Sequence, residues 1–238
     1  MSLPVAILAG GMALRLRPIT NEIPKALIEV GGKPFAEHQL ELLRRNGLTR
    51  VVFCLGYRGE TVQEVFGEGQ EVGMRIDYAF DTPTLLGTGG ALRNALPLLG
   101  DDFFVLYGDS YLDCDYVAVE QAYRASKKTG LMTVYRNKDQ WDTSNVLFRD
   151  GEIVSYDKLH PVPAMEHIDY GLGVLSAPAM EPYPRDTWLD LATVYQDLLS
   201  RGQLAGYEVA ERFYEIGSKR GLEEIQEYLS RSSRGTRK

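Results

Sequence analysis

Short apolar runs alternate with segments of helical character over the first 135 residues, and this alternation is the sequence feature that constrains the fold most strongly. The runs predict strands at Val5–Ala9, Val51–Leu55, Arg75–Phe80, Phe103–Tyr107 and Leu131–Tyr135. The segments between them predict helices at Pro34–Asn46, Glu60–Phe66, Thr88–Leu96 and Tyr116–Lys128, the last ended by Gly130. Strands joined in this way pair in parallel and need helices on both faces. The sequence therefore predicts an α/β fold with a mostly parallel sheet between two helical layers.

The second half of the chain has a different pattern. Asp150-Gly151 lies between the predicted strands Asn145–Arg149 and Glu152–Tyr156, and this dipeptide is a strong signal for a β-hairpin. Further elements are expected at Gly173–Ser176 (a strand), Leu189–Ser200 and Gly221–Leu229 (helices). We interpret residues 1–230 as a single domain with a small antiparallel insertion, and the basic residues 231–238 as a disordered tail.

Composition narrows the class of protein. The net charge is −7 although the last eight residues carry four positive charges, and an acidic body argues against nucleic-acid binding. No apolar run reaches the roughly 20 residues of a membrane span, and the start of the chain lacks the pattern of a signal peptide. Cys54 and Cys114 stand in unrelated contexts, which is typical of reduced thiols. We therefore expect a cytoplasmic protein without a membrane or nucleic-acid partner.

The loop after the first predicted strand carries the strongest functional signal. Gly10 and Gly11 end the strand, and Arg15, Arg17 and Lys25 follow in a segment that two prolines restrict. Glycine allows close approach to the backbone, whose N–H groups can point together at oxyanions. Arginine and lysine supply the cations that phosphate groups need. This combination predicts a polyphosphate site.

A carboxylate follows another buried strand, where Phe103–Tyr107 leads into Gly108-Asp109. Magnesium in proteins often takes only one or two carboxylates together with substrate phosphates. Asp109 therefore suits a magnesium site, while an aspartate that caps a turn is the alternative.

A second glycine-rich turn, at residues 86–91, opens a predicted helix. The free N–H groups of Gly87, Thr88, Gly89 and Gly90 can bind an anion or the edge of a base. A helix N-cap at Thr88 explains the same residues. Ligands of open α/β sheets bind beyond the carboxyl ends of the strands, so Gly10-Gly11, Gly56, Asp81 and Gly108-Asp109, which follow predicted strands, are expected to line one crevice.

The motifs LAGG…RLRP, LLGTGGAL, FFVLYGDS, SYDK and RFYEIGS together resemble the sugar-1-phosphate nucleotidylyltransferases. The resemblance extends from Val5 to Leu229 and is nearest to the short bacterial enzymes that act on heptose 1-phosphate or N-acetylmuramate 1-phosphate. It implies a Rossmann-like fold of the glycosyltransferase-A type. It also implies that an NTP and a sugar 1-phosphate give an NDP-sugar, of the kind used for cell-envelope polysaccharide, and pyrophosphate, with Mg²⁺ as cofactor.

The resemblance also assigns roles to residues. Arg15 matches the arginine that grips the triphosphate, Lys25 the lysine that bridges the phosphates, and Lys158 the lysine that holds the sugar phosphate. Asp109 matches the metal-binding aspartate, and Glu215 stands where a second one is usual. Nucleotide contacts are expected from Leu8, Ala9, Gly10, Gly11, Asp81, Gly87, Thr88, Gly89 and Gly90. Sugar-phosphate contacts are expected from Gly108, Asp157, Lys158, Asp169, Tyr170 and Gly171.

The chain departs from the family pattern at Ala13, Leu14, Asp157 and Glu215. None of these changes removes a cation, so they bear on substrate choice more than on the reaction. A carboxylate at Asp81 can accept from a guanine edge, which favours GTP. The sugar and the oligomeric state stay open, a homo-oligomer included.

Two other functions remain as alternatives. A glycosyltransferase that consumes an NDP-sugar would bind metal through an Asp-x-Asp motif, and Asp113-Cys114-Asp115 has that spacing. A non-catalytic regulatory subunit would lack the charged catalytic residues, whereas Arg15, Lys25 and Asp109 are all present.

Overall fold

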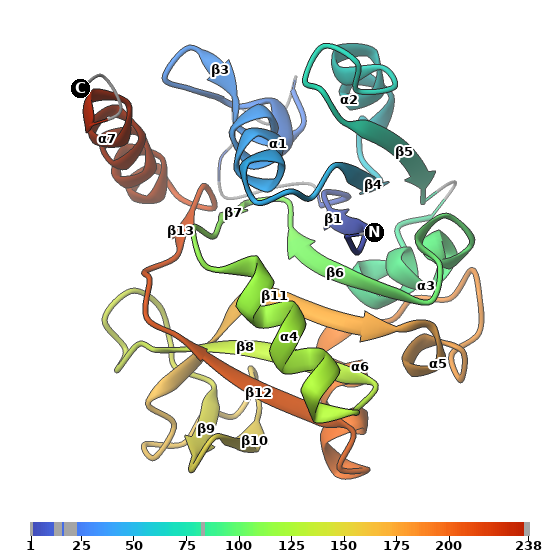
Figure 1. Cartoon of the computed structure of the whole chain (residues 1–238), viewed down its shortest axis with the longest axis vertical. Helices are drawn as coiled ribbons and strands as arrows, with labels where there is room; N and C mark the ends of the chain where they lie inside the picture. Colours follow the sequence, from blue (N-terminus) through green and yellow to red (C-terminus); the bar gives the residue numbers. More distant parts are fainter. Residues whose placement is uncertain (1, 12–15, 17–22, 82–83, 236–238) are drawn as a thin grey trace.

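A mixed sheet of nine strands forms the centre of the protein in the computed structural model, which describes residues 2–11, 16, 23–81 and 84–235. Four parallel strands make up one half of it: β6 (Asp102–Tyr107), β1 (Val5–Leu8), β4 (Arg50–Leu55) and β5 (Arg75–Phe80). The other half contains β11 (His167–Ser176), β8 (Gly130–Arg136), β12 (Leu204–Val209), β9 (Val146–Arg149) and β10 (Glu152–Tyr156). The β11 strand is antiparallel to β6 and joins the two halves (Figure 1).

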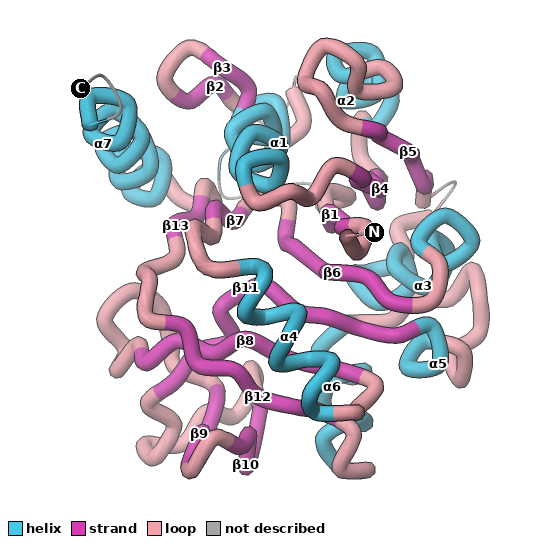
Figure 2. The backbone as a smooth tube through the Cα atoms, in the orientation of Figure 1, coloured by secondary structure: helices cyan, strands magenta, loops and turns pink. Residues whose placement is uncertain are grey.

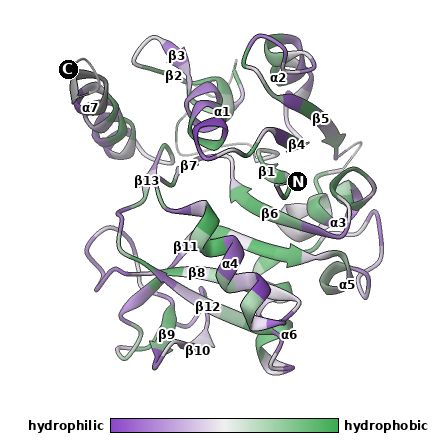
Figure 3. Ribbon diagram, viewed as in Figure 1, coloured by the Kyte–Doolittle hydropathy of each residue, from purple (hydrophilic) through white to green (hydrophobic). Residues whose placement is uncertain are grey.

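Helices cover both faces of the sheet, as the sequence predicts (Figure 2). Side chains of Val5 and Ile7 pack on one face with α1 (Phe35–Arg45), α2 (Gly59–Phe66) and α4 (Tyr116–Ser126). Ala6 and Leu8 pack on the other face with α3 (Gly87–Leu99), α5 (Ala177–Met180) and α6 (Leu191–Ser200). Successive side chains of a strand point to opposite faces, and here both faces are buried. The central strands β6 and β11 are accordingly hydrophobic along most of their length (Figure 3).

A third apolar cluster lies beside α1, away from the main sheet. Leu16, Ile28, Val30, Phe35 and Ile225 belong to it. It joins α7 (Lys219–Gly235) to residues of the short strands β2 (Glu29–Val30), β7 (Ser110–Tyr111) and β13 (Tyr214–Glu215). The 3-10 turn η3 (Lys25–Leu27) and the strand β3 (Lys33–Pro34) flank β2 in the sequence. The predicted magnesium ligands are thereby attached to a structured segment rather than to a free loop.

Several local predictions are confirmed and others need correction. The hairpin between β9 and β10 forms with positive φ at Asp150 (52°) and Gly151 (81°), as its turn requires. The helix expected to end before Gly130 ends at Ser126, because Lys127 adopts a left-handed conformation (φ 55°) and Gly130 begins β8.

Other elements are longer than predicted or absent from the prediction. The strand at Gly173–Ser176 begins at His167, and the strand β12 is missing from the prediction because its sequence, LAGYEV, has little apolar alternation. The last helix continues past Leu229 to Gly235, so residues 231–235 of the expected tail are helical. Among the described residues, no helix has the length and apolar character needed to cross a bilayer.

Candidate functional site

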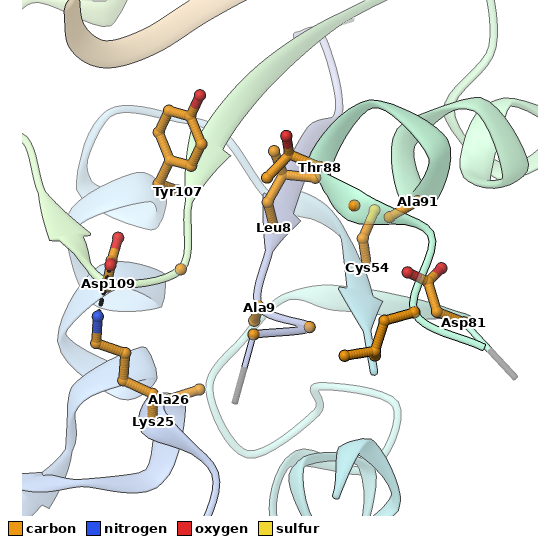
Figure 4. Close-up of a pocket in the computed structure, with 15 residues that line it drawn as sticks. Leu8, Ala9, Lys25, Ala26, Cys54, Asp81, Thr88, Ala91, Tyr107 and Asp109 are labelled. Atoms are coloured by element: carbon orange, nitrogen blue, oxygen red, sulfur yellow. Dashed lines mark hydrogen bonds and ion pairs between the residues drawn. The ribbon is translucent and has the colours of Figure 1, made fainter. Parts of the chain in front are cut away.

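A pocket of about 270 Å³ lies at the carboxyl ends of β1, β4, β5 and β6 (Figure 4). Its lining combines the first glycine turn with the ends of three further strands and the start of α3. The lining residues are Leu8, Ala9, Gly10, Gly11, Lys25, Ala26, Cys54, Asp81, Leu85, Gly87, Thr88, Ala91, Tyr107, Gly108 and Asp109. The shared crevice predicted at this edge of the sheet is therefore present, except that Gly56 does not line it: Gly56 packs against the backbone of Gly10 instead.

Glycines let neighbouring strand ends approach closely at the floor of the pocket. A Cβ on Gly56 would lie 2.7 Å from the Gly10 carbonyl oxygen, and a Cβ on Gly108 would lie 2.8 Å from the Ala9 Cβ. The Gly108 N–H donates to the Leu8 carbonyl oxygen at 2.9 Å, which extends the β1–β6 pairing by one residue. Gly108 thus sets the position from which Asp109 enters the pocket.

The Gly108→Ala variant is expected to lose about 1–3 kcal/mol of unfolding free energy, because the new methyl group overpacks a contact between two backbones. Urea unfolding followed by circular dichroism measures this change. A Gly108→Ala variant that unfolds at the same urea concentration as the wild type would show that β1 and β6 can move apart at this point without a loss of stability.

Lys25 and Asp109 form an ion pair at one end of the pocket, with 2.6 Å between Nζ and Oδ2. Pro24 precedes Lys25 and leads into η3, whose Ala26 and Leu27 are buried and hold the lysine in place. Gln39 of α1 donates through Nε2 to the carbonyl oxygens of Tyr107 (3.0 Å) and Ser110 (2.7 Å) and fixes the turn that carries Asp109. Both charged side chains remain partly exposed, so a ligand can reach them.

Glu215 lies beside this ion pair although it is 106 residues from Asp109 in sequence. The β13 strand pairs with β7, so that Glu215 stands opposite Ser110, and the Ile216 N–H donates to the Asp109 carbonyl oxygen at 2.9 Å. Burial raises the pKa of the Glu215 carboxyl, the Asp109 charge raises it further, and Lys25 opposes both effects. Two carboxylates and one ammonium group therefore meet at this end of the pocket.

Asp81 occupies the other end of the pocket (Figure 4). Its backbone N–H donates to the Leu55 carbonyl oxygen at 2.8 Å, which extends the β4–β5 pairing past Phe80. Only 7% of the residue is exposed, and its Oδ2 accepts a hydrogen bond from the Leu86 N–H at 3.2 Å. Burial raises the pKa of the Asp81 carboxyl, and the Leu86 hydrogen bond opposes this shift.

Lys158 lies near the pocket on the antiparallel side of the sheet. Its Nζ is 3.3 Å from Asp169 Oδ2 and 3.4 Å from the hydroxyl of Tyr107, which lines the pocket. Asp169 also accepts from the Tyr156 hydroxyl at 3.1 Å and from the Gly171 N–H at 3.1 Å. These contacts hold the ammonium group close to Tyr107 while leaving it about one-third exposed.

The second glycine turn differs from the prediction. Gly87 (φ 72°) and Thr88 line the pocket, but the N–H groups of Gly89 and Gly90 donate to the Leu189 carbonyl oxygen at 2.8 and 3.2 Å. The Thr88 hydroxyl accepts from the Leu191 N–H at 2.9 Å, so it caps α6 rather than its own helix. The N–H groups of Gly89 and Gly90 were expected to be free; that expectation is wrong, because the segment before α6 satisfies them.

Two predicted sugar-phosphate contacts also have other roles. Tyr170 follows Asp169 on β11 and therefore points to the opposite face, where it is buried against Tyr135 and Phe213. Asp157 accepts from the N–H groups of Leu159 and His160, so it forms the turn around Lys158. Tyr170 is thus a core residue, and Asp157 shapes the backbone that presents Lys158.

The alternative metal motif is also used for structure. Asp113 accepts from the Tyr228 hydroxyl at 2.7 Å, Cys114 is buried, and Asp115 caps α4 by accepting from the Ala118 N–H at 3.0 Å. None of the three lines the pocket. Their arrangement does not favour an Asp-x-Asp metal site.

Comparison with known proteins identifies the family. A family model described as nucleotidyl transferase matches residues 5–145, which is more than half of the chain. The chain belongs to this family. The matched part includes the first glycine turn, Lys25, Asp81 and Asp109, which are the residues that build both ends of the pocket.

Curated relatives of this nucleotidyl transferase align over about half of their length. D-glycero-alpha-D-manno-heptose 1-phosphate guanylyltransferase of Campylobacter jejuni is 35% identical over 109 residues, which cover 46% of this chain and 48% of that protein. N-acetylmuramate alpha-1-phosphate uridylyltransferase of Neisseria meningitidis is 37% identical over 116 residues, covering 48% and 50%.

Solved structures extend the likeness in fold to nearly the whole nucleotidyl transferase. HddC of Yersinia pseudotuberculosis, solved in complex with GMP-PN, superposes with a TM-score of 0.79 over 96% of this chain and all of that chain, at 24% identity. At this identity the likeness concerns the fold alone. The predicted mixed-sheet, Rossmann-like fold is thereby confirmed.

In this nucleotidyl transferase the structure brings most of the predicted site residues together. Leu8 to Gly11, Lys25, Asp81, Gly87, Thr88, Gly108 and Asp109 line one pocket. Arg15 lies outside the described residues. Sequence reasoning missed Ala26, Cys54, Leu85 and Tyr107. Cys54 and Tyr107 each lie within two residues of a glycine that follows a strand, which was the available signal.

Proposed function

We propose that this nucleotidyl transferase transfers a nucleotidyl group from an NTP to a sugar 1-phosphate and releases pyrophosphate. The observation that carries this proposal is the Lys25–Asp109 pair at one end of a glycine-lined pocket, with Lys158 reaching toward the same pocket through Tyr107. Lys25 thus lines a site whose first glycine turn suits phosphate, and Lys158 lies close to that site, within an acidic protein. Such a site is suited to two anionic reactants.

Magnesium is part of the proposal. Asp109 and Glu215 present two carboxylates at the phosphate end, and no larger group of metal-binding side chains occurs among the described residues. A pair of carboxylates completed by substrate phosphates and water is a donor set that Mg²⁺ commonly accepts. When bound by Asp109 and Glu215, the ion would supply positive charge to the phosphate oxygens.

The proposed reaction needs positioning and charge neutralisation rather than a general base. An oxygen of the sugar 1-phosphate, already ionised at neutral pH, attacks the α-phosphorus of the NTP. The bond from the α-phosphorus to the bridging oxygen breaks, and the electron pair leaves with pyrophosphate. Lys25 would hold the phosphates of the NTP, and Lys158 would hold the sugar phosphate, so that the reactants meet despite their like charges.

Lys158 gives a test of this division of roles. The Lys158→Ala variant is expected to raise the KM for the sugar 1-phosphate roughly tenfold to a hundredfold, since a hydrogen bond to a charged group is lost. The KM for the NTP is expected to change by less than about threefold. Steady-state kinetics measure both, with Lys138→Ala as the control because Lys138 is exposed and lies outside the pocket. Equal increases in both KM values would contradict the assignment.

The reaction itself is tested by incubating the protein with each of four NTPs and a panel of sugar 1-phosphates in the presence of Mg²⁺. Pyrophosphate release that requires both substrates supports the proposal. Consumption of an NDP-sugar without pyrophosphate would instead indicate a glycosyltransferase, and nucleotide binding without turnover across the panel would indicate a regulatory subunit.

The proposed reaction also suggests a cellular compartment and a use for its product. We infer that the protein works in the cytoplasm, where NTPs are made and where the buried thiols of Cys54 and Cys114 stay reduced. An NDP-sugar made there would serve as a donor for cell-envelope polysaccharide.

A further inference from the structure

The pocket has two ends of different chemistry. Lys25 and Asp109 stand at one end, and Asp81 stands at the other (Figure 4). The wall between them is apolar or small, made by residues such as Leu8, Ala9, Cys54 and Ala91. A ligand that fills this pocket therefore needs an anionic end, a flat apolar middle and a group that suits a carboxylate.

If the ligand is an NTP, as the proposed function requires, the difference between the two ends of the pocket determines which way the nucleotide lies. The phosphates of an NTP belong beside Lys25, because a phosphate next to the buried Asp81 carboxylate would face a like charge in a poorly hydrated place. The base then lies at the Asp81 end. Apolar walls such as those of Leu85 and Ala91 suit the faces of a base ring.

The Asp81 carboxylate has unused capacity to accept hydrogen bonds. Among the described residues, its Oδ2 accepts one bond, from the Leu86 N–H, and no side chain pairs with it. A carboxylate offers about four acceptor sites. The backbone of Asp81 is fixed by its bond to Leu55, so the carboxylate cannot turn away by moving the strand end. A buried acceptor of this kind is costly to leave unmatched.

We propose that Asp81 selects guanine by accepting hydrogen bonds from the N1–H and N2 amino groups of the base, so that GTP is the preferred nucleotide. Guanine presents these two donors side by side on one edge, which a carboxylate can accept together. Adenine places the N1 lone pair beside its amino group, and uracil flanks its single N3–H with two carbonyl oxygens. Cytosine places the N3 lone pair beside its amino group. Each of these bases brings a lone pair toward the carboxylate.

The test compares the binding of GTP, ITP, ATP and UTP with Mg²⁺ to the intact protein by calorimetry. ITP is guanosine triphosphate without the N2 amino group. Wild-type protein is expected to bind GTP about tenfold to a hundredfold more tightly than ITP, which is the effect of one hydrogen bond to a charged group. The Asp81→Asn variant is expected to bind GTP more weakly by a similar factor, because its amide nitrogen is a donor where the base also donates. Its affinity for ATP is expected to stay constant or increase.

The matched control is Asp150→Asn, which makes the same chemical change in the exposed β9–β10 turn, where asparagine before glycine is equally suitable. It is expected to keep the wild-type order of affinities. If circular dichroism shows that Asp81→Asn does not fold, the comparison of GTP with ITP on wild-type protein still tests whether the pocket recognises the N2 amino group of guanine.

Wild-type binding of UTP, ATP or ITP as tight as that of GTP would overturn the inference, as would an Asp81→Asn variant that weakens all four nucleotides equally. The proposed function is judged separately. Pyrophosphate release with a non-guanine NTP would keep the reaction and reject guanine selection. A strong preference for GTP in binding, without pyrophosphate release from GTP in the presence of any sugar 1-phosphate, would keep guanine selection and reject the proposed reaction.

Discussion

Replacement of Lys25 by alanine is expected to lower turnover by about 10²–10³-fold, since one preorganised charge at the reacting phosphates is lost. Lys25 is the described cation that lines the pocket, and its Nζ is held by Asp109 at 2.6 Å. The measurement is kcat from pyrophosphate release at saturating concentrations of both substrates. Circular dichroism should show an intact fold, because the side chain is partly exposed and its neighbours Ala26 and Leu27 provide the packing.

Lys33→Ala is the control for this experiment. Lys33 lies eight residues further along, pairs with Glu37 and Glu41 outside the pocket, and loses a similar charge when replaced. The turnover of the Lys33→Ala variant is expected to stay within about twofold of wild type, because ion pairs on the protein surface contribute little free energy. A Lys25→Ala enzyme with near-normal turnover would remove this lysine from the mechanism and leave the proposed phosphate end without its main support.

Replacement of Asp109 by asparagine is expected to lower turnover by roughly 10²-fold at a fixed Mg²⁺ concentration and to raise the Mg²⁺ concentration needed for half-maximal rate. The amide keeps the shape of the side chain but removes the charge that would attract the ion and that pairs with Lys25. Glu215 would remain as the single carboxylate at this end. A Mg²⁺ titration of the initial rate measures both effects.

Asp101→Asn is the matched variant, because Asp101 precedes β6 at its opposite end and is exposed. It is expected to leave the Mg²⁺ response unchanged. An Asp109→Asn protein with a wild-type Mg²⁺ titration would show that this carboxylate is not a metal ligand, and the ion pair with Lys25 would then be its main role.

The parallel half of the fold could be predicted because its information is local. The strands β1, β4 and β6 are mostly apolar runs that lead into a glycine, and β5 leads into Asp81. Both faces of the sheet are buried at β1, β4 and β6 and demand apolar residues there. The prediction failed where neighbours far along the chain decide the structure. β12 pairs with β8 across about 70 residues, and its Gly206 packs against Phe148. No pattern within LAGYEV records those partners.

In the candidate site, too, some placements follow from local sequence and others depend on distant segments. Gly10, Asp81 and Asp109 follow strands whose carboxyl ends meet, so their convergence follows from the topology that the sequence predicts. The use of the Gly89 and Gly90 N–H groups could not be foreseen, because the Leu189 carbonyl oxygen that accepts them comes from a segment about 100 residues away. Asp169 faces Lys158 and Tyr156, whereas Tyr170 faces the core on the other side of the sheet, and this depends in the same way on which elements cover each face of β11.

The sequence by itself therefore determined the alternation of strands and helices, the parallel half of the sheet and the edge at which charged residues gather, because apolar periodicity and strand ends are properties of neighbouring residues. Only the tertiary structure decided that Glu215 joins Lys25 and Asp109, that Lys158 is held near Tyr107 by Asp169, and that Asp81 stands at the opposite end of the pocket from the cations. These placements arise from pairing between distant segments, where hydrogen bonds and burial, rather than local preference, determine which side chains share a site.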